Sequence, residues 1–273
     1  MITINNDSQS LGTQQILNSS QSKTETAIER LASGKQLNSA KDDAANLAIA
    51  LKYASELSSG QQAYRNINDG ISMLQVAEGG LGEMNQLVGR MEELAIRSGN
   101  GSLNSDDRSA LQSEMDGLQQ EVMRLAEATT FNGNPLLSGG DPLQLQLGTE
   151  AGDGLTVAGI DATAELGGLG FGTIDISSAA STPAALDIIG QAQTFISDSR
   201  GSIASNMNRI ESAAASLQVE QENVAAAKSR IEDADYARQI ADLTASMIQN
   251  QSGQAMLAQA NVSSQTAMAM LNI

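Results

Sequence analysis

One long ladder of apolar residues constrains this chain more than any other feature of its sequence. Between Leu186 and Ile231, a spacing of alternately three and four residues continues without a break. Such spacing places side chains on one face of a helix and is typical of a coiled coil. It predicts a helix of about 45 residues, roughly 70 Å long at about 1.5 Å per residue. The apolar positions are Leu186, Ile189, Ile196, Ile203, Met207, Ile210, Ala214, Leu217, Val224 and Ile231, and the polar ones are Gln193, Arg200, Gln221 and Lys228.

A second ladder predicts another long helix, from about Ala44 to Ser98. An apolar residue precedes each of its polar positions, as expected when a helix of period 3.6 drifts against a repeat of 3.5. Glycines at 79, 80 and 82 weaken this helix, each by about 1 kcal/mol relative to alanine. The Gly-, Ser- and Asn-rich residues 98–104 then end it. The apolar positions are Ile67, Ile71, Leu74, Leu81, Val88 and Ala95, and the polar ones are Glu78, Asn85 and Glu92.

A shorter ladder, from Leu111 to Leu125, predicts a third helix. Ser105 is its predicted N-cap, because a serine hydroxyl can accept a hydrogen bond from an otherwise unpaired N–H of the first turn. Asp106 and Asp107 follow, and negative charge is favourable at that end of a helix. The sequence therefore predicts that this helix starts at the Ser105 cap.

From Thr130 onward the helical period is lost. Residues 132–135, Asn-Gly-Asn-Pro, predict a turn. Residues 141–147 alternate with period two, and Asp-Gly followed by residues 155–157 completes the pattern of a β-hairpin. Residues 158–184 are rich in Gly, Ala, Ser and Thr with almost no helical period, so they predict an exposed loop or the tip of the molecule.

The two ends of the chain have sparser apolar stripes than its middle. Residues 1–42 and 232–273 are rich in Gln, Asn, Ser and Ala, and helices of that kind bury too little surface to be stable alone. We expect them to fold only with partners. The predicted fold is mainly α, a long antiparallel coiled-coil bundle with a small β-hairpin and with the N- and C-terminal helices paired at one end. The stripes are Ile4, Leu11, Ile28 and Leu31, and Ile240, Leu243, Met247, Leu257 and Met268.

Composition excludes several classes of function. The net charge of −17 repels nucleic acid and anionic lipid, so neither is an expected partner. The chain has no His, the commonest general base and metal ligand, and no Cys for thiol chemistry. It shows no signal-peptide pattern at its N-terminus and no apolar run long enough to span a membrane. We expect no cofactor.

Clusters of acidic residues invite a catalytic or metal-binding interpretation, because paired carboxylates can exchange protons or bind Ca²⁺. None of them has the spacing of a calcium-binding loop or lies near a nucleophile motif. We interpret them as solvated faces, helix caps or subunit contacts, and expect neither a catalytic nor a metal site. The clusters are Asp42-Asp43, Glu92-Glu93, Asp106-Asp107 and Glu232-Asp233 with Asp235.

Two blocks of sequence, one near each end, match the signatures of a known protein family. Residues 27–35, AIERLASGK, and 37–45, LNSAKDDAA, resemble the N-terminal signature of the bacterial flagellins. Residues 65–72, 90–100 and 131–133 continue it in order and at the expected spacings. Residues 229–237, SRIEDADYA, and 257–261, LAQAN, resemble the C-terminal signature. The resemblance covers roughly residues 1–147 and 186–273, most of the chain.

The resemblance implies an organisation into domains. In flagellins the two termini pair to form the inner tube of a filament, which corresponds to residues 1–42 and 232–273. Residues 43–176 would form the helical and hairpin part of an outer-tube domain, and residues 186–231 its C-terminal helix. Residues 177–185 would be a short exposed loop that replaces the outer domains of larger flagellins.

The resemblance also implies function and partners. It implies a structural protein, not an enzyme, that forms a homopolymeric filament for swimming, is exported by the flagellar type III system and is extracellular. An export chaperone, the cap proteins and the hook-junction proteins would be its other partners. Two alternatives stay open: a hook–filament junction protein, which shares the terminal segments, and a receptor-binding module for which assembly is incidental.

Two sets of surface residues follow from the resemblance. The surface recognised by Toll-like receptor 5 in responsive flagellins matches Arg90, Leu94 and Glu114, which could equally serve contacts between protofilaments. Gly89 and Arg97 stand where responsive members usually have Gln, and these departures leave receptor recognition open. Flagellins often carry O-linked glycans, for which the candidate acceptors are Ser177, Ser178 and Ser181.

Overall fold

The structure is a computed structural model that describes residues 8–150 and 152–271, with side-chain surroundings for residues 10–150 and 152–262. It divides into a terminal unit, Met1–Leu57 with Glu222–Ile273, and a central unit, Ser58–Gln221. The helices are α1 (Ser8–Ser33), α2 (Ala44–Ser98), α3 (Ser105–Ala128), α4 (Ala162–Gly168), a 3-10 turn η1 (Phe171–Thr173), α5 (Thr182–Glu232) and α6 (Tyr236–Leu271). The strands are β1 (Thr130–Phe131), β2 (Asn134–Pro135), β3 (Leu143–Gln146) and β4 (Gly154–Val157).

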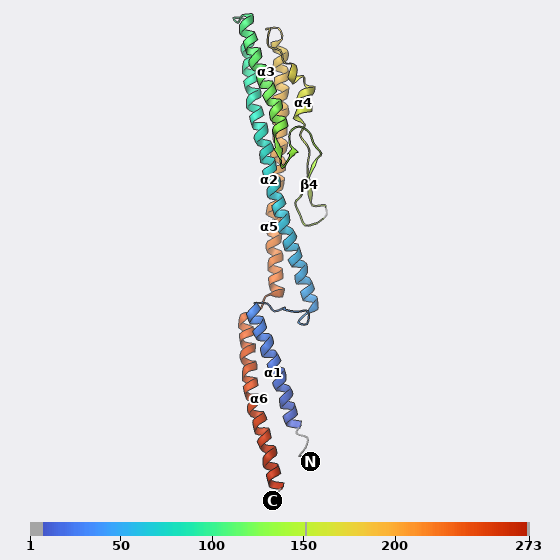
Figure 1. Cartoon of the computed structure of the whole chain (residues 1–273), viewed down its shortest axis with the longest axis vertical. Coiled ribbons are helices and arrows are strands. Elements are labelled where there is room, and N and C mark those ends of the chain that lie inside the picture. Colours follow the sequence, from blue (N-terminus) through green and yellow to red (C-terminus); the bar gives the residue numbers. More distant parts are fainter. Residues whose placement is uncertain (1–7, 151, 272–273) are drawn as a thin grey trace. The chain divides into compact units, whose positions relative to one another are not determined.

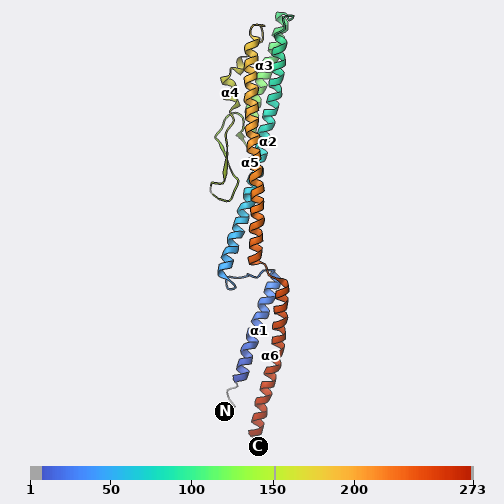
Figure 2. The ribbon, with the colours of Figure 1, turned by 180° about the vertical axis from the view of Figure 1, so that it is seen from behind.

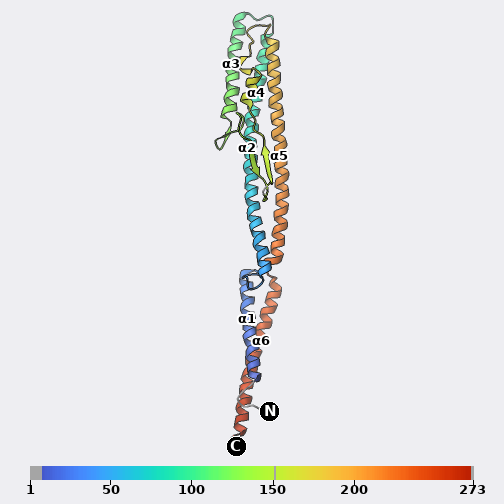
Figure 3. The same ribbon diagram turned by 90° about the vertical axis from the view of Figure 1, so that its right-hand side faces the viewer.

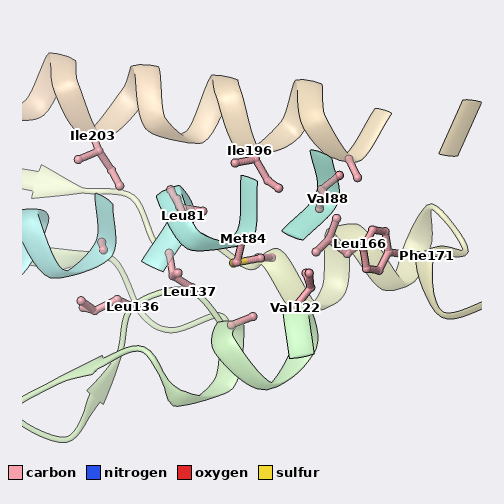
Figure 4. Packing of buried hydrophobic residues seen from close by; sticks show 14 of the residues in the cluster. Leu81, Met84, Val88, Val122, Leu136, Leu137, Leu166, Phe171, Ile196 and Ile203 are labelled. Carbon is pink, nitrogen blue, oxygen red and sulfur yellow. The ribbon is translucent and has the colours of Figure 1, made fainter. Parts of the chain in front are cut away.

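Within the central unit, α2, α3 and α5 run side by side, and α4 and the β3–β4 hairpin lie along one side of them (Figures 1 and 2). The two predicted long helices are confirmed: α2 has the predicted bounds, and α5 extends the prediction by about one turn. Five residues of each ladder, spaced seven apart, are buried in one shared core, as Figure 4 shows for its middle part. These buried ladder residues are Ile67, Leu74, Leu81, Val88 and Ala95 on α2, and Ile189, Ile196, Ile203, Ile210 and Leu217 on α5.

The predicted hairpin is confirmed. β3 and β4 pair antiparallel, with Leu143 opposite Val157 and Gln146 opposite Gly154. Leu145 of β3 lies over α2, where a Cβ atom on Gly70 would come within 2.8 Å of its Cδ1 atom. Glycine at position 70 therefore allows the strand to lie directly on the helix.

The predicted turn at residues 132–135 is part of a second, smaller hairpin formed by β1 and β2. Asn132 and Gly133 both have positive φ, 51° and 82°. Two consecutive positive φ values define the type I′ turn, for which Asn-Gly is the preferred pair.

The cap of α3 corrects one prediction. The N-cap is Asn104 and not Ser105, which is the first residue of the helix. The Asp107 N–H donates to Asn104 Oδ1 at 2.8 Å, and the Asn104 N–H donates to Asp107 Oδ2 at 3.2 Å. The cap lies one residue earlier because only there does an acidic side chain three residues on complete this reciprocal pair.

Residues 158–184 correct another prediction, because they are not an exposed loop. They form α4 and η1 and bury five apolar side chains: Ala162, Leu166, Phe171, Ile174 and Ile176. Gln112 of α3 bonds the Ile174 carbonyl and the Ile176 N–H, and Gln119 bonds the Phe171 carbonyl. The segment showed no helical period because its apolar residues anchor a short helix and irregular backbone.

The predicted exposed loop at 177–185 is also shorter than expected. α5 begins at Thr182, where Thr182 and Ala185 are buried. Residues 177–180 are exposed, so an exposed connection remains, and it ends where α5 begins. Among the described helices, none combines the length and apolar content that crossing a lipid bilayer requires.

Candidate interaction surface on the terminal helices

The terminal and central units differ in whether their apolar side chains are buried or exposed. Of the buried apolar residues in the described part of the chain, only Ala27, Leu37 and Ala50 belong to the terminal unit. By contrast, fifteen large apolar side chains are exposed among the residues whose side-chain surroundings are described, and eleven of these belong to the terminal unit. They are Leu11, Ile16, Ile28, Ile49, Leu51, Tyr236, Ile240, Met247, Ile248, Met256 and Val262.

The interface between α1 and α6 is polar. The two helices lie side by side in all three views (Figures 1 to 3). Ser20 Oγ donates to the Ser246 carbonyl at 2.8 Å, and Thr24 Oγ1 donates to Ser246 Oγ at 3.1 Å. Asn250 Nδ2 donates to Thr24 Oγ1 at 3.1 Å. Ser20 and Ser246 are only 2% and 3% exposed. Together Ser20, Thr24, Ser246 and Asn250 form what we call the polar seam.

The polar seam reverses the usual arrangement of an amphipathic helix pair. Small and polar residues make most of the contact with the partner helix, joined by Leu17, which packs against Gly253, whereas most of the large aliphatic residues are exposed. Full burial of one large aliphatic side chain stabilises a protein by about 1.5–3 kcal/mol. A partner that covered the exposed stripes would therefore bind with a favourable change in free energy. A helix pair without an apolar core is marginal by itself. The geometry therefore indicates a surface that binds other protein.

A second set of contacts joins the α1–α2 connection to the α5–α6 connection. The Gln36 N–H donates to the Glu232 carbonyl at 2.7 Å, and the Ala234 N–H donates to the Gly34 carbonyl at 2.9 Å. Lys35 Nζ lies 2.5 Å from Glu232 Oε1. We call residues 34–36 and 232–234 the clasp. It brings together the Ser-Gly-Lys and Ile-Glu-Asp parts of the two sequence signatures, although about 200 residues separate them.

The clasp has defined backbone and charge requirements. Gly34 follows α1 with a φ of 70°, the left-handed conformation that favours glycine just after a helix. The hydrogen bond from Lys35 lowers the pKa of the Glu232 carboxyl, and the charges of Lys228 and Lys35 lower it further against the opposing effect of burial. The same hydrogen bond and charge raise the pKa of Lys35. Both groups are therefore charged at neutral pH.

The acidic pair Asp42-Asp43 is a capping device. Asp42 Oδ2 accepts hydrogen bonds from the N–H groups of Asn38 and Ser39. The pKa of the Asp42 carboxyl is lowered, mainly by the hydrogen bond from the Ser39 N–H. Asp43 Oδ1 accepts from the N–H groups of residues 45 and 46, in the first turn of α2. These contacts match the helix-cap interpretation. Within the described residues, no three His, Cys, Asp or Glu side chains lie close enough to hold a metal ion.

The structure brings together only two of the three residues matched to the receptor surface. Arg90 Nη2 lies 3.0 Å from Glu114 Oε1, and both side chains are about half exposed. Leu94 is 1% exposed and belongs to the core, so it is not part of the exposed surface. This corrects the expectation that all three residues form one accessible face.

The three candidate glycan acceptors lie in the connection before α5, where all three side chains take part in local hydrogen bonds. Ser178 Oγ accepts from the Ser181 N–H at 3.2 Å, and Ser181 Oγ donates to the Ser178 carbonyl at 2.9 Å. Ser177 is exposed, and its N–H donates to Asp175 Oδ1 at 2.8 Å. The Ser177 side chain also bonds the Asp175 carboxyl, and this bond is the main cause of the lowered pKa of Asp175.

Sequence reasoning missed the polar seam, because it counted only apolar residues. The signal was present: positions 239, 243, 246, 250 and 253 of α6 follow a spacing of three and four, but most are polar or small. Of the predicted apolar stripes, Leu11, Ile28, Ile240 and Met247 are exposed, whereas Leu31, Leu243 and Leu257 are partly buried. Ile4 and the side chain of Met268 lie outside the described residues.

Comparison with known proteins places this architecture in one family. Residues 4–141 match the model of the bacterial flagellin N-terminal helical region, and residues 186–271 match the model of the bacterial flagellin C-terminal helical region. The chain is 38% identical to a flagellin of Halalkalibacterium halodurans over 90% of each chain. It is 34% identical to the flagellar filament 30.7 kDa core protein of Treponema maltophilum over 98% of this chain and 99% of that one.

A solved structure agrees with these sequence matches. The crystal structure of Bacillus cereus flagellin is 27% identical and superposes with a TM-score of 0.52, covering 60% of this chain and 94% of that one. The two family models together span both ends of the chain, including the clasp and the polar seam. The chain belongs to the bacterial flagellin family.

Proposed function

We propose that this chain is a structural subunit that self-assembles into the bacterial flagellar filament, and that its terminal helices are the assembly element. The observation that carries the proposal is the arrangement of α1 and α6, which bury a polar seam and expose most of their large aliphatic residues. A second copy of the same chain supplies matching apolar stripes, so repeated copies can cover one another in a helical array. The naming of the Treponema maltophilum relative as a filament core protein supports this.

The finer parts of the proposal follow from family membership. Residues 1–42 and 232–273 would form the inner tube, and residues 43–176 and 186–231 the outer one. The chain would leave the cell through the flagellar type III system, to be extracellular, with an export chaperone, the cap proteins and the hook-junction proteins as partners. The absence of Cys and the low aromatic content of 2% suit passage through a narrow channel as an unfolded chain.

A receptor-binding role rests on a smaller surface. Arg90 and Glu114 are exposed and paired across α2 and α3, and they are matched to residues that Toll-like receptor 5 contacts in responsive flagellins. Binding by the monomer that survives removal of both terminal segments would favour this role over assembly. The hook–filament junction alternative predicts instead that the chain caps existing filaments without elongating them.

Seeded polymerisation followed by electron microscopy tests the proposal. The full-length chain and a form lacking residues 1–42 and 232–273 would be compared, with filament fragments as seeds. We expect the full-length chain to elongate the seeds into tubular filaments and the truncated form to stay monomeric while its central core remains folded. A full-length chain that stays monomeric on every seed would contradict the proposal.

Acid should weaken the filament partly through the clasp. The pKa of Glu232 is lowered in the folded state, so its ion pair with Lys35 contributes stability at neutral pH and loses it as the pH falls through that lowered pKa. We expect Glu232→Gln filaments to be weaker at pH 7 and to change less than parent filaments as the pH falls below about 4.5. Light scattering during acid titration measures this, with Glu25→Gln as the control. Identical profiles for the parent and Glu232→Gln would show that the clasp carries none of the acid sensitivity.

A further inference from the structure

Methionine supplies all of the sulfur in this chain. The sequence contains eleven Met residues but no Cys and no Trp. The thioether of methionine is soft, and common oxidants convert it to a sulfoxide. Since Cys and Trp are absent, the response of the chain to an oxidant depends chiefly on which methionines the fold exposes.

The described methionines fall into three grades of exposure. Side-chain surroundings are described for eight of them, and four of these are buried in the central unit. Two more are partly buried in the same unit. Met247 and Met256, both on α6, are the exposed ones of the eight, with 58% and 63% of their surface accessible. The buried ones are Met73, Met84, Met91 and Met115, and the partly buried ones are Met123 and Met207.

Met247 and Met256 lie on two different flanks of α6. They are nine residues apart, which is about two and a half turns of helix, so their side chains point to opposite sides. Ser246 and Asn250 of the polar seam lie between these two directions and bond to α1. Neither thioether is covered by α1, so both stay accessible in the free monomer even when the terminal helices open.

Oxidation changes these two side chains from apolar to polar. One oxygen atom passes from hydrogen peroxide to the sulfur, so that methionine becomes methionine sulfoxide and the peroxide is reduced to water. The S=O group of the product is a hydrogen-bond acceptor, and its burial without a donor is unfavourable. An oxidised side chain therefore opposes the covering of a surface that the thioether favours.

We propose that Met247 and Met256 are sites of oxidation in the free subunit, and that a sulfoxide at either one excludes the chain from assembly. The inference rests on the proposed function, because it requires both flanks of α6 to be subunit contacts. Neighbouring subunits then cover both sulfur atoms, so an assembled chain is protected from the reaction that excludes a free one. The exclusion is reversible, since a sulfoxide can be reduced back to the thioether.

Brief oxidation of the native full-length monomer tests the choice of sites. Hydrogen peroxide is added to give less than about one sulfoxide per chain, and mass spectrometry of peptides measures the sulfoxide fraction at each methionine. We expect Met247 and Met256 to react at least about tenfold faster than the buried methionines, which become accessible only when the core opens. Equal rates at the exposed and the buried methionines would overturn the proposal.

Preformed filaments test the protection. The same treatment should oxidise Met247 and Met256 at least about tenfold more slowly in filaments than in monomer, because the neighbouring subunits must open first. Met123, which is partly buried in the central unit, is the internal reference and should change less. Oxidation of the two α6 methionines at the monomer rate in intact filaments would contradict their covering.

Seeded assembly of the partly oxidised monomer tests the exclusion. Polymer is separated from unassembled chain by sedimentation, and the sulfoxide fractions of the two are compared. We expect sulfoxide at residues 247 and 256 to be at least about fivefold lower in the polymer than in the supernatant, and sulfoxide at Met123 to be about equal in both. Methionine sulfoxide reductase with a dithiol should return the excluded chains to the polymer.

The outcomes separate this inference from the proposed function. If the untreated chain elongates the seeds but the sulfoxides at residues 247 and 256 enter the polymer freely, the inference is wrong and the proposed function stands. If the untreated chain elongates no seed, the proposed function fails and the inference fails with it. Chains that stay excluded after complete reduction would also overturn the inference, because the damage would then lie elsewhere.

Discussion

Replacing Ile248 by aspartate is expected to raise the critical concentration for filament growth by at least about tenfold while leaving the monomer equally stable. Ile248 lies on α6 with 60% of its surface exposed, facing away from the polar seam. In a filament this side chain would be covered by a neighbouring subunit. The substitution removes the gain from burying isoleucine and adds the cost of burying a carboxylate. In the monomer the same position is solvated, so the free energy of unfolding should change by less than about 0.5 kcal/mol.

Val219→Asp is the matched control, since Val219 is also aliphatic and is 58% exposed, but on the central unit. Sedimentation of polymer from monomer at a series of concentrations gives the critical concentration for each variant. If Ile248→Asp assembles at the parent's critical concentration, the outward face of α6 is not a subunit contact. If both variants are equally impaired, the assembly surface extends over both units and the terminal helices are not its principal part.

Replacing Phe171 by alanine is expected to destabilise the central unit by about 3–5 kcal/mol. Phe171 is completely buried in the core, close to Leu166 and Val122 (Figure 4), and Gln119 bonds its carbonyl. Removing the ring would leave a cavity that α4 and the surrounding irregular backbone can only partly fill. A loss this large is characteristic of a core position and would not occur in an exposed loop.

Urea unfolding followed by the helical circular dichroism signal measures this change. Glu165→Ala, at an exposed position of α4, is the control and should lie within about 0.5 kcal/mol of the parent. A Phe171→Ala variant as stable as the control would mean that residues 162–176 do not belong to the core.

The long helices could be predicted from sequence because a repeated pattern averages over many residues. Each of the α2 and α5 ladders contains a run of five aliphatic residues at intervals of seven that are all buried, from Ile67 to Ala95 and from Ile189 to Leu217. The β3–β4 hairpin could be predicted because alternation and an Asp-Gly pair act locally. In these cases the local pattern and the tertiary structure agree.

Residues 158–184 could not be predicted because their structure depends on partners distant in sequence. Ile174 and Ile176 are held by Gln112, more than 60 residues earlier, and no local period indicates this. The N-cap of α3 was misplaced for a related reason: Asn104 and Ser105 are both good capping residues, and the position of Asp107 decides between them.

The candidate interaction surface, like the fold, could be predicted from the sequence only in part. The expectation that the terminal helices need partners follows from their composition. The polar seam could not be predicted in this way, because the hydrogen bond from Ser20 to the Ser246 carbonyl joins residues 226 positions apart. Leu94 was matched to a surface through the resemblance, although it occupies a buried position on α2 next to the ladder residue Ala95. A match to a family motif does not show whether a side chain is accessible.

Hydrogen exchange of the terminal helices tests the central claim most directly. Amide exchange in α1 and α6 would be measured by mass spectrometry in monomer and in filament, with α3 as the internal reference. If assembly covers the aliphatic faces, exchange in α1 and α6 should slow at least about a hundredfold in the filament, while α3 changes little. Equally slow exchange of α1 and α6 in monomer and filament would contradict the claim that these helices depend on neighbouring subunits.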